Sequence, residues 1–579
     1  MGTLDGFETY AQDAMASWHC PGVAVAIVQG DELLHQSAHG WRDVERQLPL
    51  TVDTRFAMAS VTKAFTAMSV ALLVDEGTLA WDTPVREYLP EFLLDDPYAT
   101  QHVSVRDMLS HRTGMPRHDL AAWRLDVSRA EFVGRMRHLR FSASFRERYQ
   151  YNNLMYYAAA HLVERVAGRP WEDLVRERIF EPLAMDATNL VPQPPRPGLV
   201  NAEGYRVDRD DDGGVRGLQH MPFGPHTALS PGAAGALFST LSDLVSWLGV
   251  HVNGGRAGDV QLVSPGALAQ MHLPQTVVPV TGMRQALLGD TIATYGMGWE
   301  IQPYRGHTLV RHGGNVEGHS LMIGFVPQHR LGVVSLTNIA QLPLAELLLY
   351  EAIDRSLGLP ERGWNDRFHA AFDPVIAGQA RSKRTAAQER LPDAAPSRST
   401  DAYEGTFGAD GYPSFEVGHD AGALRARLLG SLPWSTLRHY HYDVFEWHLT
   451  DFDHVVKIRF LGSDTGEIDA VAIPIEPEVG DVTFRRAPPD LSDDVIAALL
   501  GTYDTPIAGV SLTITAHDGA LSLTRTASAP ESLTAYKLDA ATVGLRSARA
   551  RLDFARDGER ITRLTLKEPG LTLEATKRA

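Results

Sequence analysis

The spacing of apolar residues predicts a mixture of helices and strands in the first 345 residues. Helices are predicted over residues 5–18, 60–76 and about 154–167. In the second helix the apolar residues fall on one stripe, and Gly77 is placed to end it. Residues 23–29 read VAVAIVQ, a continuous apolar run typical of a buried strand, and residues 33–37 return after a turn. This pair predicts a β-hairpin close to the start of the chain.

Further strand patterns close this region, over residues 297–302, 308–312, 321–326 and 332–337. Between the two groups of strands, residues 191–232 are rich in Pro, Gly and Asp, which indicates a long surface excursion. A hairpin, then helices, then strands is the element order of an α+β domain whose antiparallel sheet gathers both ends of the segment. We therefore predict an α+β domain over residues 1–370.

A polar segment follows this domain, and the character of the chain changes after it. Residues 371–397 hold few apolar residues and no strand pattern, so we interpret them as a linker. Strands and turns then alternate, and the pattern repeats: Gly405-Thr406-Phe407 recurs as Gly501-Thr502-Tyr503. We predict two small all-β antiparallel barrels, over residues 398–488 and 489–579.

Composition and charge exclude several functions. The 579 residues carry a formal net charge of −17, which disfavours binding to nucleic acid because phosphates are repelled. The single cysteine, Cys20, rules out an internal disulfide and a Cys-based zinc site. The longest apolar stretch, near residues 68–74, is too short to cross a membrane, and no signal-peptide pattern opens the chain. We therefore expect a cytoplasmic protein without a membrane partner.

The distribution of lysine singles out one residue. Only six of the 54 Lys and Arg residues are Lys, and Lys63 is alone in the first 382 residues. A guanidinium group does not lose its proton in proteins, whereas a buried amine does. Ser60 precedes Lys63 by three residues in the predicted helix, so the hydroxyl and the amine share one face. A buried Lys63 could accept the proton of a nucleophilic Ser60; the alternative is a capping Ser beside a surface Lys.

Two more short motifs could complete such a site. Tyr151 and Asn153 lie just before the predicted helix at 154, where a phenol can move protons and an amide can bind a carbonyl. The alternative is a packing Tyr and a helix cap. His312-Gly313-Gly314 ends a predicted strand, and paired glycines let a substrate lie close to it. The next amide, on Asn315, could donate to an oxyanion, whereas a tight turn with a structural His is the alternative.

These motifs, S-x-x-K, Y-x-N and H-x-G in this order, resemble those of the superfamily of class C β-lactamases, penicillin-binding proteins and serine esterases. The resemblance extends over about residues 7–345. It includes the sequences before and after the three motifs: Phe56-Ala57-Met58-Ala59, Leu109-Ser110-His111-Arg112-Thr113-Gly114, Pro182-Leu183-Ala184-Met185 and Tyr295-Gly296-Met297-Gly298-Trp299.

The resemblance implies a fold and a mechanism. Ser60 would be the acylated nucleophile, and Lys63 with Tyr151 would form the acid–base apparatus. Asn153 would position the substrate amide, His312, Gly313 and Gly314 would line the strand beside it, and the backbone amides of Ser60 and Asn315 would form the oxyanion hole. The D-aminopeptidases of this superfamily also carry two C-terminal β-barrels, which matches the repeat found here.

One residue departs from the pattern of most β-lactamases. His312 stands where those enzymes carry a Lys that holds the substrate carboxylate, and imidazole is only partly charged near neutral pH. We therefore expect a hydrolase of small amides or esters, of D-aminopeptidase type. The alternatives are a carboxylesterase or β-lactamase on the same scaffold, or a penicillin-recognising protein that does not turn over. The expected partner is a small-molecule or short-peptide substrate, and the chain could act alone or as a homodimer.

No cofactor and no metal are expected. Residues 208–213 resemble the opening of a calcium loop, but Gln219 replaces the closing Glu, so we interpret them as a solvated acidic turn. His439, His441 and Asp443 alternate along a predicted strand, which we interpret as the polar outer face of a barrel.

Overall fold

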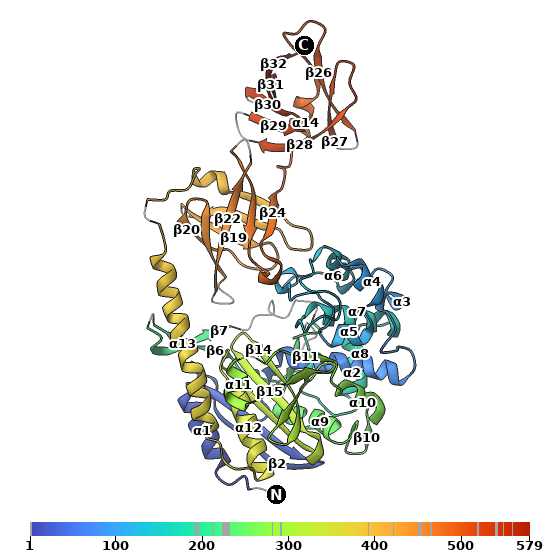
Figure 1. The fold of residues 1–579 in the computed structure, drawn as a ribbon, viewed down its shortest axis with the longest axis vertical. Coiled ribbons are helices and arrows are strands. Elements are labelled where there is room, and N and C mark those ends of the chain that lie inside the picture. Colours follow the sequence, from blue (N-terminus) through green and yellow to red (C-terminus); the bar gives the residue numbers. More distant parts are fainter. Residues whose placement is uncertain are drawn as a thin grey trace. The chain divides into compact units, whose positions relative to one another are not determined.

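The computed structural model describes residues 3–191, 196–210, 212–222, 232–280, 282–289, 292–391, 393–420, 422–449, 454–463, 466–517, 520–538, 542–547, 549–557 and 560–578. The chain divides into two units, residues 1–484 and 485–579, each with its own cores (Figure 1). The first unit contains a mixed α+β domain and a barrel, and the second unit is a barrel.

A nine-stranded sheet forms the centre of the α+β domain, in the order β11-β12-β13-β14-β15-β16-β1-β2-β3. Its strands are β1 (Gly22–Gln29), β2 (Glu32–Asp43), β3 (Leu48–Pro49), β11 (Thr276–Val278), β12 (Ala293–Tyr295), β13 (Glu300–Tyr304), β14 (His307–Val316), β15 (His319–Val326) and β16 (Leu331–Thr337). Val23 of β1 pairs antiparallel with Thr337 of β16, so the two ends of the domain meet at the middle of the sheet, as the element order predicts.

Alternation along β1 sends its side chains into two separate cores. Ala24, Ala26 and Val28 enter the core on one face, and Val23 and Ile27 enter the core on the other. The helices are α1 (Phe7–Ser17), α2 (Thr62–Asp75), α3 (Val85–Tyr88), α4 (Pro97–His102), α5 (Val105–Leu109), α6 (Arg129–Arg135), α7 (Leu154–Ala167), α8 (Trp171–Val175), α9 (Leu241–Val252), α10 (Pro265–Met271), α11 (Gly282–Leu288), α12 (Leu344–Leu357) and α13 (Trp364–Gln388). Figure 1 shows α1, α12 and α13 on one side of the sheet and α2 and α7 on the other.

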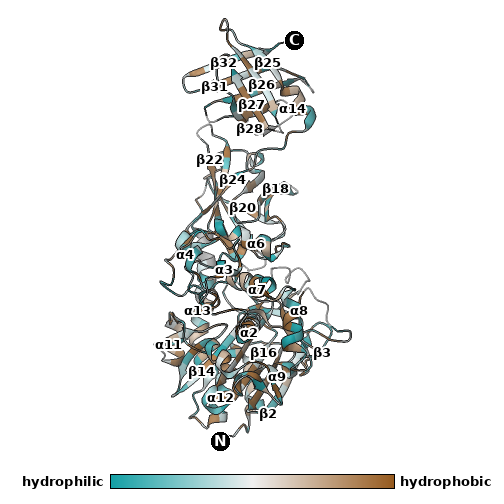
Figure 2. Ribbon diagram, turned by 90° about the vertical axis from the view of Figure 1, so that its right-hand side faces the viewer, coloured by the Kyte–Doolittle hydropathy of each residue, from teal (hydrophilic) through white to brown (hydrophobic). Residues whose placement is uncertain are grey.

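Helix α2 is buried on every side instead of on one stripe. Each residue from Thr62 to Leu73 is buried, and the helix stands out in hydrophobic colour in Figure 2. It packs against α7, α8 and α10, so even its polar side chains lie away from water. A lysine on this helix therefore has no route to a solvated position.

The segment predicted as a linker begins as a helix. Helix α13 runs to Gln388, and its Trp364 and Phe368 are buried against α12, while Phe372 is partly buried. These aromatic residues recur every four positions, which is a helical stripe at the start of an otherwise polar segment. Within the predicted surface excursion, β6 (Gly204–Arg209) and β7 (Val215–Met221) form a hairpin, and residues 192–195, 211 and 223–231 lie outside the described residues.

Both C-terminal segments form closed eight-stranded antiparallel barrels, as predicted. The strands of the first barrel are β17 (Gly405–Gly408), β18 (Phe415–Asp420), β19 (Ala423–Leu428), β20 (Ser435–His441), β21 (Val444–Leu449), β22 (His454–Gly462), β23 (Ile468–Ile473) and β24 (Val482–Arg486). After α14 (Asp493–Leu499), those of the second are β25 (Gly501–Asp504), β26 (Ser511–His517), β27 (Ala520–Arg525), β28 (Glu531–Leu538), β29 (Thr542–Arg546), β30 (Arg551–Asp557), β31 (Arg560–Glu568) and β32 (Leu571–Lys577). Phe415 and Val417 are buried in the first barrel as Leu512 and Ile514 are in the second, which confirms the register of the repeat.

In the described part of the chain, no helix is both long and apolar enough to cross a membrane. The single cysteine, Cys20, is buried.

The second barrel carries its own core, so we expect residues 485–579 to fold when expressed alone. Leu523, Val543, Leu552 and Phe554 are each 0% exposed in this core, and burial of apolar side chains is the dominant stabilising term in folding. Circular dichroism and a dispersed amide spectrum check this. The variant Leu523→Asp, which places a charge in that core, serves as the unfolded control. An undispersed spectrum from the unsubstituted fragment would contradict the prediction.

Candidate active site

Ser60 lies at the entrance to helix α2, in a 3₁₀ turn over Ala59–Val61. Ala59 has φ 43°, a left-handed conformation that is rare for a residue with a Cβ and costs about 1–3 kcal/mol. Strain of this kind persists only where surrounding contacts fix it. Gly314 of β14 supplies one of them, because a Cβ there would lie 2.6 Å from the Met58 carbonyl oxygen and 3.1 Å from the Ala59 Cβ. The second glycine of the H-x-G motif therefore lets β14 lie directly against the turn that carries Ser60.

Lys63 lies one helical turn beyond Ser60 and points at it. Its Nζ donates to Ser60 Oγ at 3.0 Å and to the Ala234 carbonyl oxygen at 3.1 Å. The side chain is 0% exposed. Burial, with a smaller contribution from the positive charge of Arg117, holds the pKa of Lys63 well below its usual value of 10.5. The alternative of a surface lysine is therefore wrong.

Tyr151 lies across from Lys63, with Lys63 Nζ 4.8 Å from the centre of the phenol ring. The Tyr151 hydroxyl is hydrogen-bonded to Ser60. Burial raises the pKa of Tyr151 above its usual value, so the phenol keeps its proton at neutral pH. Of the two groups that contact Ser60, the amine is shifted toward the form that accepts a proton, and the phenol toward the form that donates one.

Asn153 does not act as the helix cap. The capping bond of α7 comes from Asn152, whose Oδ1 accepts from the Met155 backbone amide at 2.9 Å. Asn153 Nδ2 donates to Asp119 Oδ1 at 2.8 Å. The two neighbouring asparagines thus have different roles. Asn152 caps the helix, and Asn153 is turned toward Asp119.

Strand β14 brings the third motif beside Ser60 along an unpaired edge. The pairing of β13 with β14 ends at Glu300↔Arg311, whereas β15 pairs with β14 as far as Val316. From His312 onward, β14 therefore has a partner on one side only. An edge of this kind leaves backbone N–H and C=O groups available to a ligand. Gly313, Gly314 and Asn315 lie on this stretch.

His312 is neutral, and both of its ring nitrogens already have partners. Nδ1 lies 2.7 Å from the Gly313 carbonyl oxygen, which can only accept, so Nδ1 carries the proton. Nε2 therefore accepts from the Tyr295 hydroxyl at 3.0 Å. Burial lowers the pKa of His312 to about 4. His312 thus offers no positive charge to a substrate carboxylate at neutral pH.

The structure also adds residues that no motif marked. Arg117 lies over the Tyr151 ring at 5.1 Å, and its Nε donates to Asp119 Oδ2 at 2.7 Å. The His111 ring lies beside the Tyr151 ring, tilted by 38° with 4.4 Å between ring centres, and its Nδ1 accepts from the Asn152 backbone amide. His111 stands in the flanking sequence LSHRTG, which was a usable signal; Arg117 and Asp119 carry none, because only the folded chain brings them to Tyr151 and Asn153.

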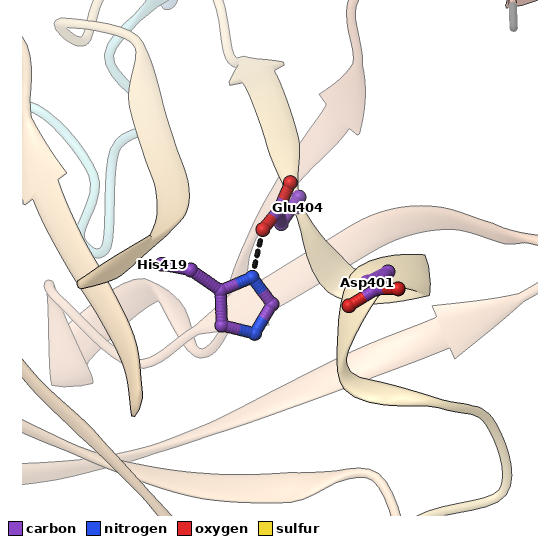
Figure 3. A group of neighbouring side chains, drawn as sticks. All are labelled: Asp401, Glu404 and His419. Carbon is purple, nitrogen blue, oxygen red and sulfur yellow. Dashed lines mark hydrogen bonds and ion pairs between the residues drawn. The ribbon is translucent and has the colours of Figure 1, made fainter. Parts of the chain in front are cut away.

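Groups that could hold a metal lie elsewhere. The acidic turn at 208–213 joins the two strands of the β6–β7 hairpin, and Asp211 lies outside the described residues. Asp443 accepts from Tyr403 and Ser397, away from His439, which contacts the Tyr442 carbonyl. Asp401, Glu404 and His419 do come together on the first barrel (Figure 3), with their ligand atoms within 4.8 Å of one another. His419 is hydrogen-bonded to Glu404, and the Asp401 and Glu404 side chains are exposed, so an ion pair on the barrel surface explains the group.

Because burial lowers the pKa of Lys63 in the folded protein, the stability of the protein should depend on pH. Unfolding takes up a proton between the folded and unfolded pKa values of Lys63, and in that range the free energy of unfolding rises by about 1.4 kcal/mol per pH unit. We expect Lys63→Met to raise the melting temperature at pH 7, and the gain to shrink as pH rises toward 10.5. Thermal unfolding at pH 7 to 10 measures this. Lys457→Met, at an exposed lysine, is the control, and a gain that grows with pH would contradict the prediction.

Comparisons with known proteins match most of the chain to two described families. The Beta-lactamase family matches residues 7–355, and a domain of unknown function, DUF3471, matches residues 389–486. A relative from Aspergillus campestris, Unguisins hydrolase ungD', is 31% identical over 408 residues, which is 67% of this chain and 72% of the relative.

Two solved structures resemble the fold. The octameric penicillin-binding protein homologue from Pyrococcus abyssi aligns over 95% of this chain and 99% of its own, with a TM-score of 0.54 and 22% identity. The D-amino acid amidase from Ochrobactrum anthropi SV3 aligns over 62% of this chain and 98% of its own, with a TM-score of 0.50 and 25% identity. With the family matched over more than half of its length, this chain belongs to the Beta-lactamase family of hydrolases.

Proposed function

We propose that this protein is a serine hydrolase that cleaves small amides or esters through an acyl-enzyme on Ser60. The observation that carries the proposal is the 3.0 Å contact between Ser60 Oγ and the Nζ of a fully buried Lys63. A serine hydroxyl is a weak nucleophile until a neighbouring base takes its proton. An amine whose pKa is held well below 10.5 is such a base at neutral pH.

The residues divide the reaction as follows. Ser60 Oγ attacks the substrate carbonyl carbon while its proton passes to Lys63 Nζ, and the oxyanion is held by the backbone N–H groups of Ser60 and Asn315. As the tetrahedral intermediate collapses, the carbon–nitrogen or carbon–oxygen bond breaks and the leaving group takes a proton. Tyr151, which keeps its proton, delivers it and is reprotonated from Lys63. Water then attacks the acyl-enzyme, and Ser60 Oγ leaves with a proton.

The substrate class follows from the charges around the cavity. His312 is neutral, so it does not hold a carboxylate as a lysine would. Asp119 presents a carboxylate beside Asn153 and is 30% exposed, which suits the free ammonium group of an amino-acid amide. The similar D-amino acid amidase supports the same class. We therefore propose an amidase of D-aminopeptidase type.

The alternatives on this scaffold are a carboxylesterase, a β-lactamase, or a penicillin-recognising protein without turnover. The homodimer also stays a prediction; the similar protein from Pyrococcus abyssi is described as octameric.

Covalent labelling tests the nucleophile. A fluorophosphonate probe should add one adduct to the wild-type protein, detected by intact-mass spectrometry, and none to Ser60→Ala. Ser242→Ala, which alters a serine of α9 whose bonds go to Gln36 and Asp53, is the control and should label like wild type. Labelling that survives in Ser60→Ala would overturn the proposal. Turnover of D- and L-amino-acid p-nitroanilides, p-nitrophenyl esters and nitrocefin then separates amidase, esterase and β-lactamase.

Substitution of His312 tests the charge argument. We expect His312→Lys to raise the ratio of kcat/KM for nitrocefin to that for a short ester, by about tenfold or more, because a charge-assisted hydrogen bond to the carboxylate is gained. Tyr295→Phe is the matched control: it removes the hydroxyl that contacts His312 and adds no charge, so the ratio should stay near the wild-type value. An unchanged ratio in His312→Lys, or a wild-type protein that cleaves nitrocefin as well as its best ester, would contradict the argument.

A further inference from the structure

The segment over residues 117–123, which we call the strap, lies between α5 and α6 and forms part of the active-site wall. One side of the strap faces the catalytic group. Arg117 lies over the Tyr151 ring, and Asp119 accepts from Asn153. Both contacts come from residues that flank a single position, His118.

His118 turns the other way, into the first barrel. Its backbone N–H donates to Glu476 Oε2 at 2.7 Å, and its Nδ1 lies 2.6 Å from the Tyr412 hydroxyl. Its Nε2 lies 2.8 Å from the Arg140 carbonyl oxygen, which only accepts, so Nε2 carries the proton and Nδ1 accepts from Tyr412. His118 is 1% exposed. Both polar hydrogens of His118, on its backbone nitrogen and on Nε2, are therefore hydrogen-bonded. Two of its three partners, Glu476 and Tyr412, belong to the first barrel.

The barrel also receives the apolar part of the strap. Leu120 is 7% exposed and is a member of the barrel's own hydrophobic core, together with residues such as Phe415 and Phe484. The Trp123 carbonyl oxygen accepts from the Ser431 hydroxyl. Hydrogen bonds and an apolar anchor therefore attach both ends of the strap to the same barrel.

The backbone of the strap is strained where the contacts converge. His118 has φ 45°, in the left-handed region that residues other than Gly adopt at a cost of about 1–3 kcal/mol. The preceding and following side chains reach the active site because of this turn. A conformation of this kind persists only while its surroundings hold it, and Glu476 and Tyr412 are among the groups that hold it.

We propose that the first barrel positions one wall of the active site through Glu476 and Tyr412. These two positioning residues fix His118, and His118 fixes Asp119 against Asn153. The barrel therefore sets how tightly the site binds a substrate that carries an ammonium group, a role that rests on the amidase proposed above. The contact between Ser60 and Lys63 is built within the catalytic domain, by α2 and the Ala234 carbonyl, so we expect the chemistry at Ser60 to depend on the barrel less than substrate binding does.

The test compares four variants of the full-length protein, one of which, Tyr412→Phe, removes the hydroxyl that donates to His118. Glu476→Ala removes the acceptor of the His118 amide, whereas Glu476→Gln keeps an acceptor oxygen and loses only the charge. Glu416→Gln is the matched control, because that carboxylate bonds to Arg427 within the same barrel. Each variant is measured for KM and kcat on an amino-acid p-nitroanilide and on an uncharged p-nitrophenyl ester, and for the rate of fluorophosphonate labelling.

We expect Glu476→Ala to raise KM for the amino-acid substrate by about tenfold. This is the loss of affinity expected when one hydrogen bond to a charged group is removed. KM for the ester and the labelling rate should change by no more than about twofold, since the Ser60–Lys63 pair is intact. Glu476→Gln should restore most of the lost affinity, and Glu416→Gln should match wild type. Tyr412→Phe should repeat the effect of Glu476→Ala more weakly.

Hydrogen exchange of the peptide spanning residues 116–124 gives an independent readout. It should exchange faster in Glu476→Ala than in wild type or Glu416→Gln, whatever the substrate proves to be. Unchanged exchange and unchanged KM in Glu476→Ala would overturn the proposal. So would an equal fall in amide turnover, ester turnover and labelling, which would mean a general loss of structure. A wild-type protein that does not label at all would instead refute the proposed hydrolase, and the exchange measurement would still decide the role of the barrel.

Discussion

The burial of a lysine beside a serine is the constraint around which the catalytic domain is built. Lys63 is fully buried, and an ionised amine in that position would lack the solvation that it has in water. The protein meets this constraint by packing α2 against α7, α8 and α10 and by giving the amine two acceptors, Ser60 and the Ala234 carbonyl oxygen. The same burial that makes the amine costly to place also makes it a base.

The environment of Lys63 favours the neutral form through charge as well as burial. Arg117, over the ring of Tyr151, adds a positive charge that opposes protonation of Lys63, and Asp119 opposes that effect only in part. The buried rings of His111 and His312, whose pKa values are also depressed, add no positive charge beside Tyr151 at neutral pH. The site thus suppresses charge by burial, and its Arg117–Asp119 ion pair is partly exposed.

How much of this arrangement the sequence predicts depends on how local the signal is. Ser60 and Lys63 are one helical turn apart, so their contact follows from the helix alone, and the hairpin and the barrels follow from alternation within short strands. Residues 371–388 of helix α13 were interpreted as part of a linker because few of them are large and apolar, and the aromatic residues Trp364 and Phe368 that mark the helix lie before them. Arg117 and Asp119 could not be found at all, because their placement depends on a bond between His118 and Glu476, 358 positions apart.

This long-range bond changes the meaning of the domain organisation. The sequence repeat suggests that the two barrels have equivalent roles, and the strands of the two barrels do pair in the same register. Yet the first barrel shares its core with Leu120 of the strap, so removal of that barrel would expose an apolar side chain and release the strained turn at His118. The second barrel has a complete core of its own and forms a separate unit. Deleting residues from 398 onward would therefore perturb the active site directly. Deleting residues from 489 onward spares β24, the last strand of the first barrel, and keeps the residues that contact the strap. Only the shorter deletion can reveal what the second barrel does.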